Sequence, residues 1–237
     1  MIDYTHRTTN KELLDNTDIP FSDIAENMKE LDFINRYLGG HAITLQGFKK
    51  LAGHLPGNLS VCEIGCGGGD NLKVLDQFCK KNKLKASFIG VDINPDCIAF
   101  ARQRVTAPNV QFIVSDYRLV NFGVARPDMI FSSLFCHHFS DGDLVAMLRW
   151  MKQNATKGFF INDLQRHPVA YHSIRLLTKL FSQSYLVKND APLSVLRGFK
   201  RQEWEHILSK SAIGDYRIEW KWAFRHLITF AGHEIKT

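Results

Sequence analysis

The feature that most constrains the fold of this chain is the segment VCEIGCGGGD at residues 61–70. Its apolar start, from Val61 to Ile64, is typical of a buried strand, and the apolar side chains after the segment recur at helical spacing. Between strand and helix, glycines stand at alternate positions: Gly65, Gly67 and Gly69. Such a turn lets backbone N–H groups approach a ligand closely, because no Cβ atom holds the ligand away. The sequence therefore predicts a ligand-binding turn at the end of the first strand.

An acidic residue ends the next predicted strand. That strand covers residues 87–91 and leads into Asp92. A carboxylate at this point suits the two hydroxyls of a ribose. The dinucleotide fingerprint G-x-G-x-x-G is not met, because Asp70 stands where its third glycine is required. This disfavours a nicotinamide-dependent oxidoreductase.

The composition fits a globular protein. The chain has 237 residues, of which 45% are hydrophobic and 23% charged. No apolar run follows a basic N-terminal start, and none has the length of a membrane span, so we expect a cytoplasmic protein. The five cysteines are an odd number at irregular spacing. They predict buried thiols in a reducing compartment and no metal site.

The positive charge is unevenly distributed. The formal net charge is +6, and the basic excess lies in residues 145–237. Such an excess could attract an anionic substrate, a membrane surface or nucleic acid, or could be a solvated face. Peripheral membrane contact therefore stays open.

The order of predicted elements indicates the fold class. Residues 1–20 are polar and predict a frayed arm or a loose cover, and helices are expected from about 21 to 38 and around 43–51. We expect these two helices to cover the ligand end of the sheet or to form part of a pocket. Strands and helices then alternate, with strands at 59–64, 87–92, 110–114, 129–132 and 158–161. This predicts an α/β fold with a doubly wound, mostly parallel sheet and a site at the carboxyl ends of its strands.

The alternation breaks after the fifth strand. The first half of an insertion there predicts an amphipathic helix, and a further helix and two strands, at 216–224 and 226–230, close the chain. We therefore expect four units: an N-terminal helical cover at 1–57, a ligand-binding core at 58–165, a helical lid at 166–198, and a C-terminal helix with an antiparallel hairpin at 199–237.

Over residues 58–231 the order of these parts resembles the class I S-adenosylmethionine (SAM) methyltransferases. The glycine turn is preceded by Glu63, Asp92 ends the second strand, Asp116 follows the third, and the segment PDMIFSSLFCHHF contains the fourth. The resemblance implies a Rossmann-like, seven-stranded sheet, SAM as cofactor and S-adenosylhomocysteine (SAH) as product.

The resemblance also implies roles for individual residues. Asp92 would hold the ribose, and Asp116 would accept from the adenine amino group, with Tyr117 beside the ring. Backbone at the glycine turn would reach the methionine part, and Glu63 would fix the turn or contact the amino group. The implied cofactor-binding residues are Glu63, Gly65, Cys66, Gly67, Asp92, Ile93, Asp116, Tyr117 and Ser133.

Two further segments are similar to narrower groups. The stretch at 136–139, CHHF, resembles the ubiquinone/menaquinone-type methyltransferases and lacks the Asn/Asp-Pro-Pro-Tyr/Phe signature of amino-group methylation. The insertion, together with INRYLGG at 34–40, resembles a bacterial subgroup of small-molecule methyltransferases associated with type III polyketide synthase products and quinones. In that group the insertion would be a lid over a phenolic or lipid-like acceptor.

Candidate catalytic and substrate-binding residues follow from these segments. A histidine at the site could take a phenolic proton as the methyl group arrives. The candidates are His137, His138 and His167, with Asp163 as an alternative base. A structural role is the alternative for each of these residues, because such side chains more often pack in the core or bond the backbone. The polar residues of the insertion that would face an acceptor are Tyr171, His172, Arg175 and Asp190.

The sequence thus predicts a SAM-dependent methyltransferase (EC 2.1.1 type) acting on the oxygen or carbon of a small, apolar phenol, quinol or polyketide-derived ring. The basic C-terminal part leaves methylation of RNA or protein as an alternative. No nucleic-acid module is visible, however, and the basic residues do not interleave with aromatic ones, so we expect no nucleic-acid partner. A non-catalytic SAM-binding module is a third interpretation, which the intact Gly65, Gly67, Asp92 and Asp116 disfavour.

Overall fold

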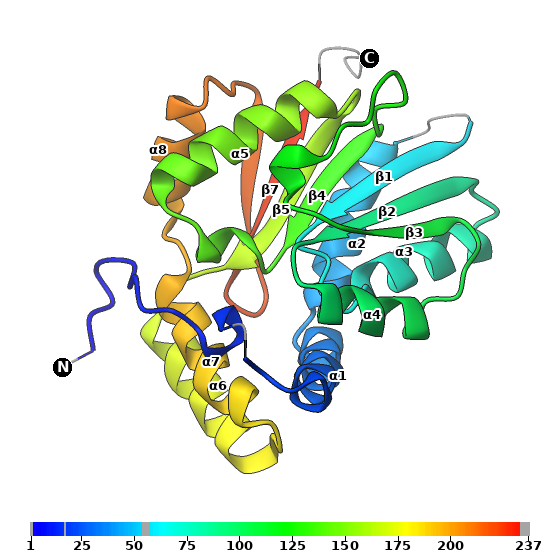
Figure 1. Ribbon diagram of the computed structural model, residues 1–237. Helices are drawn as coiled ribbons and strands as arrows, with labels where there is room; N and C mark the ends of the chain where they lie inside the picture. Colours follow the sequence, from blue (N-terminus) through cyan, green and yellow to red (C-terminus); the bar gives the residue numbers. More distant parts are fainter. Residues whose placement is uncertain (1, 17, 54–56, 233–237) are drawn as a thin grey trace.

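A computed structural model describes residues 2–16, 18–53 and 57–232. Its centre is a seven-stranded sheet in the order β3-β2-β1-β4-β5-β7-β6 (Figure 1). The strands are β1 (Leu59–Ile64), β2 (Ala86–Asp92), β3 (Val110–Val114), β4 (Met129–Ser133), β5 (Gly158–Leu164), β6 (Tyr216–Lys221) and β7 (Arg225–Ala231). Only β7 is antiparallel to its neighbours β5 and β6. The predicted Rossmann-like α/β fold, with its closing antiparallel hairpin, is confirmed.

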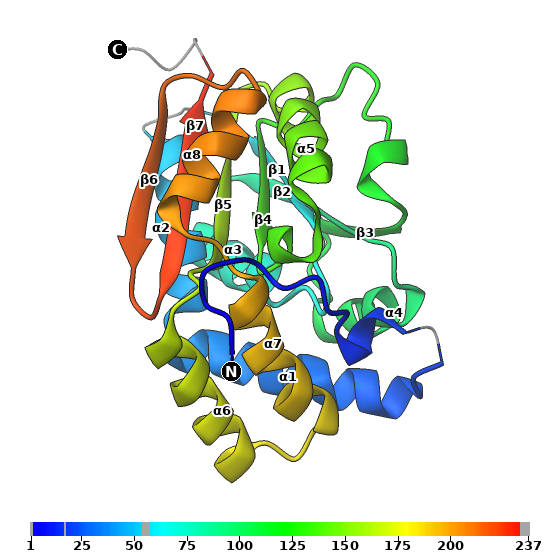
Figure 2. The ribbon, with the colours of Figure 1, turned by 90° about the vertical axis from the view of Figure 1, so that its left-hand side faces the viewer.

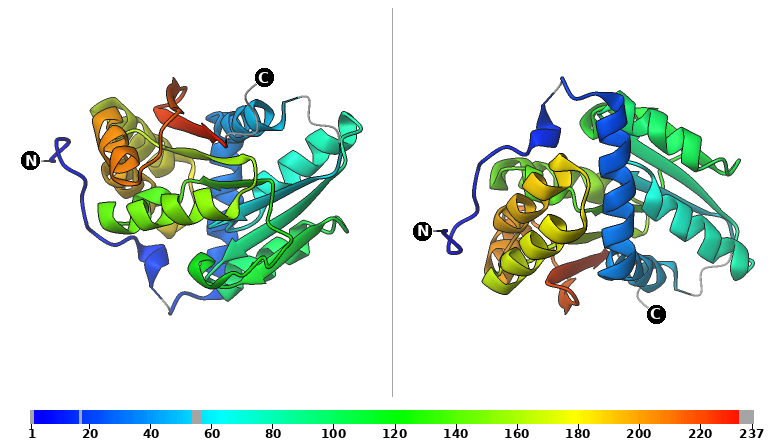
Figure 3. Two further views of the ribbon diagram at one scale, coloured as in Figure 1. Left: turned by 90° about the horizontal axis from the view of Figure 1, so that it is seen from above. Right: turned by 90° about the horizontal axis from the view of Figure 1, so that it is seen from below.

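Helices cover both faces of the sheet and the carboxyl end of its strands. They are α1 (Phe21–Tyr37), α2 (Gly40–Ala52), α3 (Asp70–Lys81), α4 (Pro95–Arg104), α5 (Asp141–Asn154), α6 (Pro168–Phe181), α7 (Tyr185–Arg197) and α8 (Arg201–Lys210). Helices α2, α3 and α4 pack on one face, and α5 and α8 on the other (Figure 3). Short 3₁₀ helices are η1 (Leu13–Asp15), η2 (Tyr117–Leu119) and η3 (Cys136–His138).

Helix α2 corrects one expectation about the N-terminal helices. It was expected at the ligand end of the sheet or in a pocket, but it packs flat on the sheet against β5 and β7. The approach is close because Gly47 lies directly over Phe160, where a Cβ atom would meet the ring at 2.4 Å. Phe160 in turn stacks on Phe131 of β4, with ring centroids 4.7 Å apart. Of these two N-terminal helices, α1 is the one that lies at the carboxyl end of the strands (Figure 1).

The insertion after β5 forms two helices side by side, α6 and α7, below the carboxyl end of the strands (Figure 2). A single amphipathic helix was predicted in its first half, and α6 confirms that helix. The turn between α6 and α7 is held by Glu30 of α1, whose carboxylate accepts from the N–H groups of Gln183 (2.7 Å) and Ser184 (3.0 Å). The insertion is therefore fastened to α1 as well as to the sheet.

The N-terminal arm, residues 2–16, is neither frayed nor loose, which corrects the expectation from its polar composition. Arg7 donates to the carbonyls of Arg197 (2.9 Å) and Phe139 (2.8 Å) and pairs with Asp141 (2.8 Å). The buried Arg166 donates to the arm's own carbonyls at 3.1 and 3.0 Å. The polar residues of the arm are thus used in specific bonds across the carboxyl end of the sheet.

None of the helices in the described residues combines the length and the apolar character that a membrane span requires.

Candidate active site

The glycine turn after β1 has the geometry that its composition predicts. Gly65 and Gly67 have φ angles of +67° and +48°, in the left-handed region that favours glycine. The N–H group of Gly65 donates to the carbonyl of Val91 at 2.8 Å, which ties the turn to the end of β2. Met28 of α1 lies over Gly67, 3.4 Å from where its Cβ atom would be. Helix α1 therefore covers one side of the turn.

Asp92 connects β2 to this turn. Its carboxylate accepts from the N–H groups of Gly67 (2.8 Å) and Asn94 (2.9 Å). Burial raises the pKa of Asp92, and these backbone donors oppose that effect. Beside it, Ile93 exposes 69% of its surface, whereas Cys66 is buried in the core. Asp92 and Gly67 thus form one rigid polar unit at the carboxyl end of the sheet.

Glu63 lies beneath the turn in a buried polar network. Its Oε1 accepts from the side-chain amide of Asn71 at 2.8 Å, and the other face of that amide contacts His41 at 3.1 Å. His41 also contacts Asp32 of α1 at 2.9 Å, and Asp32 pairs with Arg104 of α4 at 2.8 Å. Burial first, and Asp70 second, raises the pKa of Glu63 well above its ordinary value. The network joins β1 to α1, α2, α3 and α4.

Asn71, His41 and Asp32 were not among the predicted site residues. The sequence feature that could have indicated this network is the pair of Glu63 and Asn71, a carboxylate and an amide on either side of the glycine turn.

Two predicted adenine-side residues lie at η2. Asp116 accepts from the backbone N–H of Arg118 at 2.9 Å and pairs with its guanidinium, which lowers the pKa of Asp116. Tyr117 is buried edge-on against Trp150, with ring centroids 5.2 Å apart, and its pKa is raised by burial to about 12. Tyr117 therefore lies in the core cluster beside α5.

The segment after β4 brings an unpredicted aromatic ring onto the glycine turn. A Cβ atom on Gly65 would lie 2.2 Å from the ring of Phe135. The buried Ser133 accepts a hydrogen bond from the side-chain amide of Asn162 at 3.2 Å. Phe135 also lies edge-on to Tyr117 at 6.4 Å. The ring of Phe135 thus faces the surface where the resemblance places the methionine part of the cofactor.

His137 and His138 lie together on η3, between the sheet and the N-terminal arm. Nδ1 of His137 is 2.8 Å from Oδ1 of the fully buried Asp163. Asp163 also accepts from the N–H groups of Cys136 (2.8 Å) and Leu164 (2.7 Å). Burial alone would raise the pKa of Asp163, but His137 and these donors outweigh it and lower the pKa.

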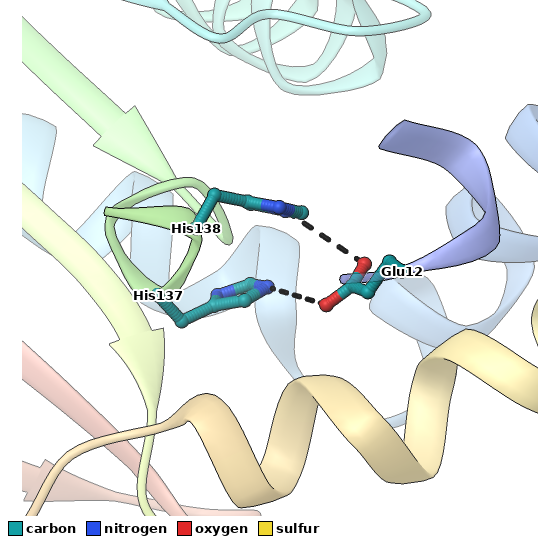
Figure 4. Close-up of side chains that lie close together, drawn as sticks. All are labelled: Glu12, His137 and His138. Atoms are coloured by element: carbon teal, nitrogen blue, oxygen red, sulfur yellow. Dashed lines mark ion pairs between the residues drawn. The ribbon is translucent and has the colours of Figure 1, made fainter. Parts of the chain in front are cut away.

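The same histidines face Glu12 of the arm (Figure 4). Nε2 of His137 is 3.6 Å and Nε2 of His138 is 3.8 Å from the Glu12 carboxylate. No signal in the local sequence links Glu12 to this site.

The third candidate base is placed differently. His167 is the N-cap of α6, where its Nδ1 accepts from the N–H of Val169 at 3.2 Å. Its ring stacks on Phe224 of the hairpin, with centroids 4.8 Å apart. The local role of His167 is therefore to begin α6 and to pack against the hairpin.

The four predicted substrate-contacting residues do not come together. Tyr171 and His172 contact Tyr4 of the arm, the latter at 3.1 Å between Tyr4 Oη and His172 Nε2. Arg175 is exposed on the same helix. Asp190 of α7 is buried, and its carboxylate accepts from the N–H groups of Leu13 (2.8 Å) and Leu14 (3.0 Å). Asp190 thus caps η1.

A hollow of about 390 Å³ lies between the chain around η1 and the start of α7. It is lined by Leu13, Asn16, Asp18, Ile19, Tyr185 and Leu186. Another hollow, of about 520 Å³, lies at the far edge of the sheet beside β6 and β7.

Comparison with known proteins agrees with this architecture. Residues 61–158 match the family model of a methyltransferase domain. Among curated protein sequences, none matches this chain at a significant level.

Several solved structures share the fold. The plantazolicin methyltransferase BpumL, in complex with SAH, aligns over 90% of this chain and 89% of its own, with a TM-score of 0.65 and 18% identity. A SAM-dependent methyltransferase from Aquifex aeolicus aligns over 90% and 99%, with a TM-score of 0.63 and 18% identity. Human N-acetylserotonin methyltransferase, in complex with SAM, aligns over 90% of this chain but 56% of its own, with a TM-score of 0.63 and 17% identity. The fold is therefore the Rossmann-like fold of the SAM-dependent methyltransferases.

Proposed function

We propose that this protein is a cytoplasmic, SAM-dependent methyltransferase that acts on a small, mostly apolar acceptor, a phenol, quinol or polyketide-derived ring. The observation that carries this proposal is the joined unit of the glycine turn and Asp92, bonded at 2.8 Å at the carboxyl end of the sheet. It stands inside a segment that matches a methyltransferase domain. Solved proteins with this fold hold SAM or SAH.

The cofactor residues take the roles that the resemblance assigns. Asp92 binds the ribose hydroxyls, Asp116 the adenine amino group, and the backbone of the glycine turn the methionine part. Glu63 fixes the turn through Asn71. Ile93, which is exposed, would contact the cofactor directly, whereas the buried Cys66, Tyr117 and Ser133 would support the site from the core. Phe135 joins this set, because its ring faces Gly65.

The chemistry requires mainly positioning. The acceptor oxygen or carbon forms a bond to the methyl carbon while the methyl–sulfur bond breaks, and the bonding pair stays on sulfur to give SAH. Holding both partners in line can contribute about 7–11 kcal/mol. A proton lost by the acceptor needs a base, which contributes roughly 10²–10⁴-fold.

The base is the histidine pair of η3 rather than His167, which is engaged as an N-cap. Asp163 accepts from Nδ1–H of His137, so that Nε2 is the nitrogen that could receive a proton. We place the acceptor in the hollow beside η1, whose lining combines apolar side chains such as Leu13 and Ile19 with polar ones such as Asn16.

The test is methyl transfer from SAM carrying a labelled methyl group to lysate from the native source. We expect label in the organic-soluble fraction, and we expect none with Asp92→Ala, whose SAM affinity should fall at least tenfold in calorimetry. Asp96→Ala, on the next helix, is the matched control and should retain both. Label in the acid-precipitable fraction would instead indicate RNA or protein as acceptor. Unchanged SAM affinity in Asp92→Ala would contradict the ribose assignment.

A further inference from the structure

Three potential ligand atoms converge between the N-terminal arm and η3. Glu12, His137 and His138 each offer one, and these atoms all lie within 4.8 Å of one another (Figure 4). Glu12 and His137 are buried, at 5% and 3% exposure, and His138 is half-buried. The N···O distances of 3.6 and 3.8 Å between the two Nε2 atoms and the carboxylate are too long for hydrogen bonds.

The other nitrogen of each ring is occupied by a carboxylate. Nδ1–H of His137 donates to Asp163 at 2.8 Å, and Nδ1 of His138 lies 3.4 Å from Oδ1 of Asp15. A proton on Nδ1 leaves a lone pair on Nε2 in each neutral ring. Both lone pairs then face the Glu12 carboxylate. Histidines that bind metal ions usually have this arrangement: one ring nitrogen donates its N–H to a carboxylate, and the other nitrogen presents its lone pair to the ion.

The local charge also calls for a cation. Three carboxylates lie beside the two rings, those of Glu12, Asp15 and Asp163. Arg197 pairs with Asp15 at 3.2 Å, and Arg7 and Arg225 act electrostatically on Asp163. For Glu12, the guanidinium of Arg197 is no closer than 4.0 Å. A buried carboxylate without close compensation is costly, and a divalent ion between Glu12 and the two rings would supply it.

Protonated histidines would balance the charge in a different geometry. An imidazolium N–H donating to a carboxylate forms a bond of about 2.7–2.9 Å. The contacts of His41 are shorter than those at Glu12, because its Nε2 lies 2.9 Å from Asp32 and its Nδ1 3.1 Å from the side-chain oxygen of Asn71. His41 therefore has no free lone pair for an ion. At Glu12 the longer distances between its carboxylate and the two Nε2 atoms leave room for an ion.

We propose that Glu12, His137 and His138 bind one first-row divalent cation of the zinc type. Two imidazole nitrogens and a carboxylate are a ligand set that zinc uses in catalytic sites, where a further position stays open. With metal–ligand bonds of about 2.0–2.2 Å, tetrahedral ligands lie roughly 3.4 Å apart. The two N···O distances of 3.6 and 3.8 Å would close by a few tenths of an ångström when the ion binds. The ion would fasten the arm over the carboxyl end of the sheet.

The open position would serve the acceptor, and this part of the inference rests on the proposed function. A divalent ion that coordinates a phenolic oxygen lowers its pKa and orients it for attack on the methyl carbon. With both Nε2 atoms bound to the ion, the histidines act as ligands in place of acting as the base. The acceptor proton then leaves to solvent or to a carboxylate of the cluster, and no redox change takes place.

The first experiment measures binding of the metal alone. Protein treated with a chelator and then desalted is titrated with Zn²⁺ by calorimetry and with Co²⁺ by visible absorption. We expect one equivalent of either ion, and Co²⁺ d–d bands without a thiolate charge-transfer band, because none of the three proposed ligands is a cysteine. Glu12→Gln and His138→Gln should each weaken binding at least tenfold. His172→Gln, which changes an exposed histidine on α6, should not.

Circular dichroism of each variant establishes that the fold is retained, and Glu12→Gln is chosen because it keeps the side chain's shape. Absence of stoichiometric Zn²⁺ binding to the unmodified protein would overturn the inference, as would unchanged affinity in both ligand variants.

Methyl transfer with and without Zn²⁺ separates the inference from the proposed function. Zn²⁺ binding without any methyl transfer contradicts the function and supports the site. Methyl transfer at an equal rate in chelator, by protein that binds no Zn²⁺, supports the function and overturns the site.

Discussion

At the scale of single residues, Gly65 concentrates two constraints in one position. Its φ of +67° disfavours any side chain, and the ring of Phe135 occupies the place of a Cβ atom at 2.2 Å. The first constraint costs a non-glycine residue roughly 1–3 kcal/mol. The clash of a Cβ atom with the Phe135 ring adds a steric cost to this conformational cost.

We therefore expect Gly65→Ala to destabilise the protein more than Gly123→Ala in urea unfolding. Gly123 has a similar φ of +55°, but a Cβ atom there would meet no neighbour within 4 Å. In a Phe135→Ala background, Gly65→Ala should cost less stability than in the parent protein, because the steric cost is removed and the conformational cost remains. Equal losses for the two glycine variants would show that Phe135 does not press on the turn.

Glu63 makes the stability of the protein depend on pH. Its pKa is raised well above the ordinary value by burial and by Asp70, so the folded protein binds this proton more tightly than the unfolded chain. For an acid shifted upward, stability is fully present below the unfolded pKa of about 4.3 and declines as the pH rises above it. Asn71 can still donate to the amide oxygen of a glutamine.

As the pH rises from about 4 to about 8, we expect the unfolding temperature of Glu63→Gln to fall less than that of the unmodified protein, measured without ligand. Glu26→Gln, on the exposed side of α1, is the control. Parallel stability–pH curves for the parent and Glu63→Gln would show that this carboxyl does not govern the dependence.

At the scale of elements, the helices and strands that could be predicted from sequence are those whose signals lie within a few neighbouring residues. The strand, glycine turn and helix around residue 65 are confirmed. Helix α4 likewise begins at a local signal, because Asn94 accepts from the N–H groups of Asp96 and Cys97. Helix α7 was not distinguished, because Pro192 lies inside it and interrupts the helical pattern. The face on which α2 packs depends on its fit to Phe160, which no pattern within α2 reveals.

The close fit of α2 to the sheet predicts an effect of Gly47→Ala opposite to the effect expected from helix propensity. Alanine is better than glycine in a helix interior by about 1 kcal/mol. Gly47→Ala should nevertheless destabilise the protein in urea unfolding, because the added Cβ would lie 2.4 Å from the Phe160 ring. Gly142→Ala, in the first turn of α5, has its nearest neighbour at 3.9 Å and should be neutral or stabilising. A stabilised Gly47→Ala protein would mean that the ring moves aside freely.

At the scale of the whole molecule, the site is assembled from segments far apart in the chain. Glu12 precedes the sheet, His137 follows β4, and Arg197 ends the insertion. The positions of the proposed cofactor residues could be predicted from sequence, because each lies in the last residues of a strand or just after it, whereas their roles stay predictions. The contact of the arm with η3 could not, because it depends on how distant segments meet.

Arg197 is the residue that joins these segments, and it supplies the last prediction. Its guanidinium donates to the carbonyls of His137 (3.1 Å), His138 (2.9 Å) and Asn10 (3.2 Å), besides pairing with Asp15. Removing one partner of such a buried ionic set typically costs about 3–5 kcal/mol, because it leaves charge and carbonyls unpaired. Arg197→Met should therefore release the arm before it weakens the sheet.

Hydrogen exchange can locate that loss within the molecule. In Arg197→Met, amides of residues 7–15 should exchange faster, whereas those of β1 and β4 should stay protected, because the strands are paired independently of the arm. Arg175→Met, on the exposed side of α6, should leave both regions unchanged. Uniformly faster exchange throughout the sheet would show instead that the arm and the core unfold as one unit, so that the cover over the site could not open without loss of the fold beneath it.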